Sequence, residues 1–197
     1  MTEDTHPTRR LYVSMLASLD GYIADREGKL DWFQDGDAAF EQYCDEMIDS
    51  VDLAIYGRKA YEEMVAYWPG AENGPGSARD RAFAKKMNAL PKLVLSRTLT
   101  EATWSNTRIV RDRVAETITA LKQQPGRSLV AWAGAGLVES LLALKLVDEL
   151  RVLVQPVVLG GGTPLFRARD ARLSLQLVRT TQLGANISLL CYEPRYA

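Results

Sequence analysis

The stretch from Ser128 to Leu146 (SLVAWAGAGLVESLLALKL) does most to limit the folds open to this chain. Its apolar run Leu129–Trp132 predicts a buried strand, and the residues after the glycines predict an amphipathic helix. Between them lies a corner, Gly134-Ala135-Gly136. A strand that enters a helix through glycines directs backbone N–H groups and the positive end of the helix dipole to one point, which suits a phosphate. The spacing begins like G-x-G-x-x-G, but Glu139 stands at the third glycine position, so a purely steric turn is an equal alternative.

A second corner of the same kind follows the apolar run Val51–Tyr56, where Gly57 and Arg58 precede a helix predicted over Lys59–Trp68. Strands and helices alternate until about residue 160, which indicates an α/β fold with a mostly parallel sheet and helices on both faces. Two alternating runs, Leu173–Leu183 and Ile187–Glu193, then predict an antiparallel hairpin. The other predicted elements are strands Arg10–Leu19, Lys92–Leu95, Thr107–Val110 and Glu149–Leu159, and helices Asp37–Ser50, Ser77–Ala89 and Val114–Gln123.

Composition removes several classes of function. The 197 residues suit one domain, predicted over residues 10–197 after a disordered tail over residues 1–9. Lys and Arg number 24 against 25 Asp and Glu, so we expect no nucleic-acid partner and no membrane surface. Cys44 and Cys191 form no close pair and no signal peptide is evident, which favours the cytoplasm. The only histidine is His6, so neither a histidine base nor a histidine-based metal site is expected, and we predict no metal.

Ligands of a parallel sheet bind beyond the carboxyl ends of its strands. Four features fall there: Asp20-Gly21, Gly57-Arg58, Ser96-Arg97-Thr98 and Gly134-Ala135-Gly136. Each alone is also what an ordinary turn or a solvated arginine provides. Together they predict a crevice for a dinucleotide, and the donors of Ser96, Arg97 and Thr98 suit a 2′-phosphate. We therefore predict NADPH as the cofactor.

The predicted loop Asp25–Gly36 contains two adjacent aromatic residues, Trp32 and Phe33. They either fold into the core or form a lid that excludes water from a nicotinamide pocket, and we assign Trp32 to the catalytic machinery on the second reading. Asp31 in the same loop is assigned to the substrate. With no histidine in the core, the proton comes from water or a carboxylic acid, and we favour Asp20 as the acid or substrate anchor. A plain turn-forming role for Asp20 is the alternative.

Several runs carry a family resemblance: SLDGYIA (Ser18–Ala24), GRKAYE (Gly57–Glu62), LPKLVLSRTL (Leu90–Leu99) and LVDELRVLVQPVVLGGGTPLF (Leu146–Phe166). The chain resembles the dihydrofolate-reductase-like proteins, and more closely the stand-alone relatives of the RibD C-terminal (riboflavin-biosynthesis reductase) domain, from about Arg10 to Pro194. The resemblance implies a three-layer fold with a central, mostly parallel eight-stranded sheet. It also implies NADPH as hydride donor and a homodimer, for which Glu149–Phe166 is the expected surface.

By the same resemblance, the cofactor-binding positions are Gly57, Arg58, Ser96, Arg97, Thr98, Gly134, Ala135, Gly136 and Leu137. On the substrate side it implies Gly160 and Gly161, and a carboxylate on the helix after the first strand, for which Asp37, Glu41 and Asp45 are candidates alongside an ordinary polar helix face. The implied activity resembles 5-amino-6-(5-phosphoribosylamino)uracil reductase. The alternatives are a true dihydrofolate reductase and a non-catalytic dimeric NADPH-binding or sensor protein.

Overall fold

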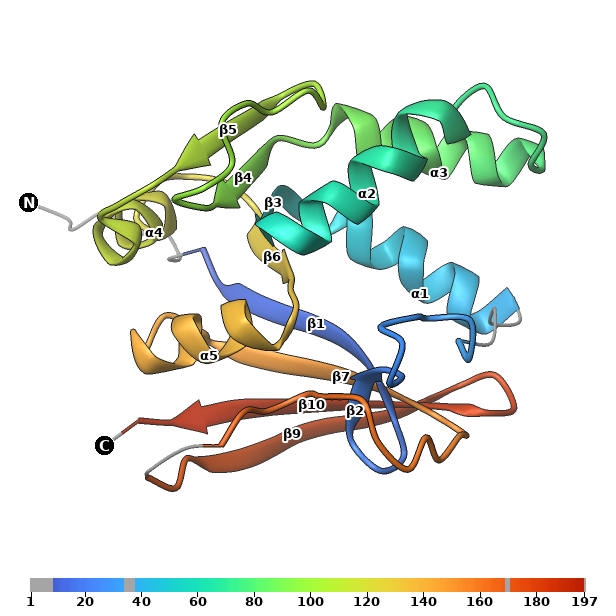
Figure 1. Ribbon diagram of the computed structural model, residues 1–197, viewed down its shortest axis with the longest axis vertical. Coiled ribbons are helices and arrows are strands. Elements are labelled where there is room, and N and C mark those ends of the chain that lie inside the picture. Colours follow the sequence, from blue (N-terminus) through green and yellow to red (C-terminus); the bar gives the residue numbers. More distant parts are fainter. Residues whose placement is uncertain (1–8, 34–37, 169–170, 197) are drawn as a thin grey trace, which may run out of the picture.

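The computed structural model describes residues 9–33, 38–168 and 171–196 (Figure 1). The strands are β1 Leu11–Ser18, β2 Tyr22–Ala24, β3 Val51–Gly57, β4 Lys92–Leu95, β5 Thr107–Val110, β6 Ser128–Trp132, β7 Glu149–Gln155, β8 Thr163–Pro164, β9 Ser174–Leu183 and β10 Ile187–Arg195. The helices are α1 Ala38–Asp49, α2 Arg58–Ala71, α3 Ala78–Ala89, α4 Val114–Lys122 and α5 Ala135–Ala143.

Eight of the strands form one sheet in the order β5-β4-β3-β6-β1-β7-β10-β9. The first six are parallel, and β10 pairs antiparallel with both β7 and β9, so the predicted terminal hairpin is confirmed. Gly184 closes the hairpin at a positive φ of 64°, a conformation in which glycine carries no steric penalty. The first strand of the chain thus lies inside the sheet, between β6 and β7.

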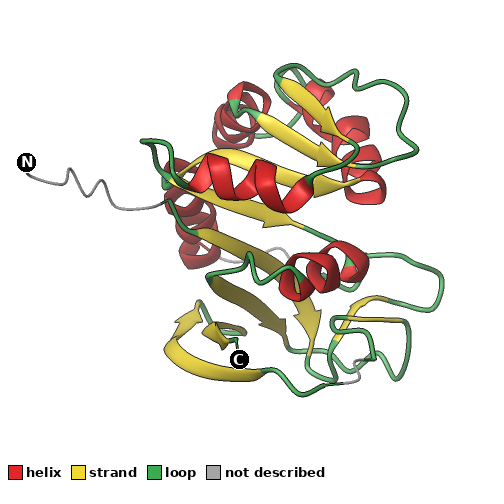
Figure 2. Ribbon diagram, turned by 90° about the vertical axis from the view of Figure 1, so that its left-hand side faces the viewer, coloured by secondary structure: helices red, strands yellow, loops and turns green. Residues whose placement is uncertain are grey.

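The helices cover both faces of the sheet, as Figure 2 shows. Alternate residues of β1 explain the two layers: Leu11 and Val13 join a buried cluster with Ile118 of α4 and Leu141 of α5. Tyr12 points the other way, into a cluster that includes residues of α1, α2 and α3. This arrangement confirms the predicted α/β fold with a mostly parallel eight-stranded sheet.

Two predicted boundaries are wrong and one small sheet was not predicted, each for a local reason. Strand β7 ends at Gln155 instead of continuing to Leu159, because Pro156 lacks the N–H that a sheet ladder needs. Helix α2 runs through Pro69 to Ala71, since a proline in the last turn removes only one helical hydrogen bond. The small sheet of β2 and β8 was not predicted, because strands of three and two residues show no periodicity.

Candidate functional site

The two glycine corners meet at one edge of the sheet. Strands β3 and β6 are neighbours and run parallel, and each is followed at once by a helix, α2 after Gly57 and α5 after Gly134. A Cβ atom added at Gly57 would lie 3.6 Å from the Cβ of Leu137 in the first turn of α5. The start of α5 therefore packs directly against the end of β3, and the predicted pairing of these corners is present in the fold.

Both helix starts are left without a side-chain cap. Gly57 and Gly134 are the N-cap residues of α2 and α5, and neither helix has an acidic residue in its first turn. By contrast, α3 begins with a complete capping box in which Ser77 and Asp80 satisfy each other's backbone N–H groups. The N–H groups that begin a helix lack acceptors four residues earlier, although that of Leu137 bonds to the carbonyl oxygen of Gly134. This edge of the sheet is therefore electropositive and suits an anion.

Two arginines increase the positive charge at these helix starts. Arg58 is exposed at the first position of α2, 3.6 Å from the carboxylate of Glu62. Arg167 comes from the segment after β8, and its Nη2 atom lies 3.0 Å from the position of an added Cβ at Gly136. Arg167 was not among the predicted site residues, because no sequence pattern links it to a corner thirty residues earlier. A guanidinium placed against the positive end of a helix dipole is consistent with an anion that binds both.

The predicted 2′-phosphate residues lie at the end of β4. The hydroxyl of Ser96 accepts hydrogen bonds from the N–H groups of Thr98 (3.2 Å) and Leu99 (3.0 Å), so it holds the turn that presents Arg97. Arg97 and Thr98 are both exposed. The position of these residues beside the end of β5 follows from the register, in which Leu95 pairs with Val110.

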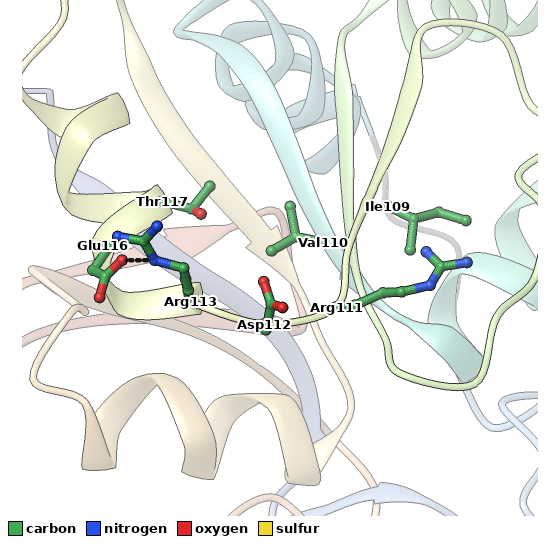
Figure 3. A pocket seen from close by; sticks show the side chains of 7 residues that line it. All are labelled: Ile109, Val110, Arg111, Asp112, Arg113, Glu116 and Thr117. Carbon is green, nitrogen blue, oxygen red and sulfur yellow. Dashed lines mark hydrogen bonds and ion pairs between the residues drawn. The ribbon is translucent and has the colours of Figure 1, made fainter.

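Beside them, the corner between β5 and α4 forms an open hollow of about 400 Å³ (Figure 3). It is lined by Ile109, Val110, Arg111, Asp112, Arg113, Glu116 and Thr117. Arg111 donates to the carbonyl oxygens of Leu99 (2.9 Å) and Thr100 (3.2 Å), which ties this corner to the loop after Ser96. Arg113 pairs with Glu116, and Figure 3 shows the two side chains together on the α4 side of the hollow. The hollow was not predicted, although the run Arg-Asp-Arg directly after a strand could have indicated it, since an arginine also follows β3.

Asp20 lies at the end of β1, where it holds a second loop in place. Its Oδ1 accepts from the hydroxyl of Ser18 (2.7 Å) and from the N–H of Leu159 (3.1 Å), and its Oδ2 accepts from the N–H of Gly160 (2.8 Å). The Ser18 hydroxyl is the main reason why the pKa of Asp20 is lowered from its ordinary value, with the two N–H groups adding to it. An ionised carboxylate accepts hydrogen bonds and is no proton donor at neutral pH, so the geometry favours an anchoring role over that of an acid.

The glycine run after β7 combines positive φ angles with close packing at Gly161 and Gly162. Gly160, Gly161 and Gly162 all have positive φ angles, and an added Cβ at Gly162 would collide with the carbonyl oxygen of Ala24. Arg26 donates to the carbonyl oxygen of Gly160 at 2.9 Å. Because the N–H of Gly160 is already bonded to Asp20, the predicted substrate contact at this residue would have to use another atom.

The loop with Trp32 and Phe33 is internally bonded. Asp25 accepts from the N–H groups of Glu27 and Lys29, and the indole N–H of Trp32 donates to the carbonyl oxygen of Lys29 at 3.1 Å. The ring of Phe33 lies 5.6 Å from that of Phe40 on α1. Asp31 is exposed on this loop. The pairing of Phe33 with α1 fixes one end of the loop over the face that α1 covers.

The two described carboxylate candidates on α1 form ion pairs with another helix. Glu41 and Asp45 both pair with Arg79 of α3, at 3.5 Å and 2.9 Å, which is what an ordinary polar helix face would do. Asp37 lies outside the described residues. Within the described ranges, no cluster of three or more His, Cys, Asp or Glu side chains is arranged to hold a metal ion. In the same part of the chain, no helix is long and apolar enough to cross a membrane.

This sheet order, with two uncapped helix starts at one edge, defines an α/β protein of the dihydrofolate-reductase-like fold. The chain is similar in structure to the dihydrofolate reductase of Enterococcus faecalis, solved in complex with NADP(H), with a TM-score of 0.61 and 16% identity. The match covers 95% of this chain and 97% of the reductase. It is also similar to a putative riboflavin biosynthesis protein from Shewanella sp. PV-4, with a TM-score of 0.73 and 25% identity. That match covers 95% of this chain and 99% of the Shewanella protein.

The model of the RibD C-terminal domain matches residues 9–189, and the chain belongs to that family. The uncharacterized protein YyaP of Bacillus subtilis (strain 168) is 31% identical over 186 residues, which cover 94% of this chain and 95% of YyaP. These comparisons confirm the family that the sequence motifs indicate, and with it a domain of the reductase type.

Proposed function

We propose that this protein is an NADPH-dependent reductase that transfers a hydride to a small heterocyclic substrate similar to that of the uracil reductases of riboflavin biosynthesis. One observation carries the proposal: the uncapped starts of α2 and α5 lie together at the Gly57–Leu137 contact, among arginines. This donor set fits a diphosphate. It would be held by the first N–H groups of both helices together with Arg58 and Arg167.

The second phosphate of the cofactor distinguishes NADPH from NADH. Arg97 with Ser96 and Thr98 would bind it, and Arg111 and Arg113 at the neighbouring hollow add further donors. NADPH, when bound, supplies the hydride. The chain's own contribution is then to position the ring, to exclude water with the Trp32 loop, and to hold the glycine run through Asp20.

Two measurements test this function in sequence. Isothermal titration with NADPH and NADH should show binding of both, with NADPH tighter. Oxidation of NADPH is then followed with 5-amino-6-ribitylaminouracil precursors, dihydrofolate and simple pyrimidines as substrates. Turnover of dihydrofolate alone would make the protein a true dihydrofolate reductase, and binding without any turnover would support the sensor alternative. Absence of NADPH binding would refute the proposal.

We also propose that the protein forms a homodimer, and that β9 provides the surface. Strand β7, within the segment expected at the interface, is hydrogen-bonded to β1 on one side and β10 on the other, so it has no free edge. Strand β9 is at the edge of the sheet and its residues 174–180 are all exposed, among them Leu175, Leu177 and Val178. An exposed apolar edge strand is a template for pairing, and a second copy of the chain would cover it symmetrically.

A further inference from the structure

The side chain of Gln155, the last residue of β7, is buried without hydrogen bonds. Its side chain has 0% exposure, and neither Oε1 nor Nε2 has a hydrogen-bond partner in the part of the chain that the structure describes. Buried amide groups are nearly always paired in native proteins, because an unpaired donor or acceptor has lost its water without replacement. A carboxamide with both ends unpaired therefore indicates a missing partner with one donor and one acceptor.

The neighbouring strands offer Gln155 no such partner. Its register partner on β1 is Ser18, whose hydroxyl already donates to Asp20 and accepts from the N–H of Tyr22. Strand alternation places Gln155 on the same face as Leu153, which packs in an apolar cluster with Ile187 and Leu189 of β10. The amide thus borders an apolar cluster with few polar groups near it, which is the usual composition of a small-molecule pocket.

This position lies on the substrate side of the proposed site. Sheet order places β6, with its cofactor corner, on one side of β1 and β7 on the other, so both strand ends open at the same edge. Phe40 of α1 packs against the cluster that contains Leu153, and Phe33 of the loop before α1 packs against Phe40. The aromatic pair therefore lies on the face of the sheet that carries Gln155.

We infer that Gln155 is a specificity-determining residue of the substrate pocket, and that its carboxamide pairs with an adjacent N–H and C=O on the edge of a planar heterocycle. A carboxamide carries one acceptor and two donors in one plane, which matches a ring –NH–C(=O)– edge in a two-point hydrogen bond. A pocket built around such a pair rejects a ligand that lacks it, because the buried amide is then left unpaired. This inference rests on the proposed function for the identity of the site, and it adds what the site recognises.

Titration calorimetry with 5,6-diaminouracil tests the inference, with the protein saturated with NADP⁺. The wild-type protein is expected to bind 5,6-diaminouracil, and the Gln155→Leu variant is expected to bind it at least tenfold more weakly. One of the two ring N-methyl derivatives should bind wild type as weakly as the variant binds the parent compound, with no further loss in Gln155→Leu. Gln123→Leu, at the exposed C-cap of α4, is the control and should bind like wild type.

Folding and cofactor binding are measured on the same variants. Gln155→Leu without ligand should unfold at or above the wild-type temperature, because an unpaired buried amide has been removed. Its NADPH affinity should be unchanged, since the cofactor corners are on other strands. Equal binding of 5,6-diaminouracil by wild type and Gln155→Leu, no binding by wild type, or a clear loss of stability in Gln155→Leu would each overturn the inference. If neither protein bound NADPH but wild type still discriminated between the N-methyl derivatives, the proposed reductase function would be refuted and the role of Gln155 would stand.

Discussion

The Cβ of Leu137 lies 3.6 Å from the point at which a side chain would begin at Gly57, so the first turn of α5 rests on the end of β3. This contact joins two corners that are about eighty residues apart in the chain. A methyl group at residue 57 would already be in van der Waals contact with Leu137, so we expect the site between the two helix starts to be sensitive to the size of residue 57.

We expect Gly57→Ala to fold and to bind NADPH nearly as well as wild type, because 3.6 Å is an ordinary van der Waals separation and Gly57 has a φ of −84° that any residue adopts. Gly57→Val should weaken NADPH binding by roughly tenfold, or about 1.4 kcal/mol, since its branches displace Leu137. Calorimetric titration checks both variants. Equal affinities for the two would show that the corner does not hold the cofactor.

Arg97→Ala should reduce the preference for NADPH over NADH by roughly ten- to a hundredfold, because a charge-assisted hydrogen bond to the 2′-phosphate is lost. The affinity for NADH should hardly change. The control is Arg108→Ala on β5, which removes another exposed arginine from the same region. An unchanged preference in Arg97→Ala would mean that the 2′-phosphate is bound elsewhere, with Arg111 and Arg113 as the next residues to replace.

Arg167→Ala is expected to weaken the binding of NADPH and NADH by the same factor, roughly tenfold, because Arg167 lies at the proposed diphosphate site beside Gly136. The preference between the two nucleotides should therefore stay as in wild type. Arg195→Ala, an exposed arginine at the end of β10, provides the comparison. A change in preference, with no common loss of affinity, would contradict the placement of Arg167 at the diphosphate.

The stabilising effect of Asp20 should depend on pH. Its folded pKa is lowered from the ordinary value of 3.8, chiefly by the Ser18 hydroxyl, so the unfolded chain binds a proton more readily than the folded one. The contribution is complete above the unfolded pKa and is lost as the pH falls through the folded pKa. The unfolding temperature of Asp20→Asn should thus be lower than that of wild type at neutral pH, and the difference between the two should become smaller in acid. Asp31→Asn, on the exposed loop, should show no such trend.

A charged residue on β9 should abolish the proposed dimer. Leu177 is 52% exposed on the edge strand, and a carboxylate there would be buried without a partner in a symmetric interface. Light scattering should show a dimer for wild type and a monomer for Leu177→Glu. Leu144→Glu, where the leucine is 44% exposed beyond α5, should remain a dimer. A wild-type monomer would refute the dimer itself.

The parts of this protein that could be predicted from sequence are those with a local signal. The glycines after the Val51–Tyr56 and Leu129–Trp132 runs mark where two strands end. Because strands alternate with helices along the chain, these strands are parallel and both corners lie at one edge of the sheet. Arg167 and Gln155 could not be found in this way. The position of Arg167 depends on how the segment after β8 folds back over α5, and the isolation of Gln155 depends on which groups fail to reach it. Both depend on tertiary packing, which the hydrophobic periodicity of the sequence does not predict.

The sheet order also has a consequence for the path by which the chain folds. Strands β1 and β3 are made early but are not neighbours, because β6 lies between them. Strand β1 has no partner until the chain has been synthesised past Trp132, and β3, which can pair earlier with β4, lacks its second partner until the same point. The site beside Gly136 forms later still, because it needs Arg167. Contacts so distant in sequence form slowly. The newly made N-terminal half therefore keeps apolar strand edges open until the later half arrives, and this is the stage at which the protein depends most on protection from aggregation.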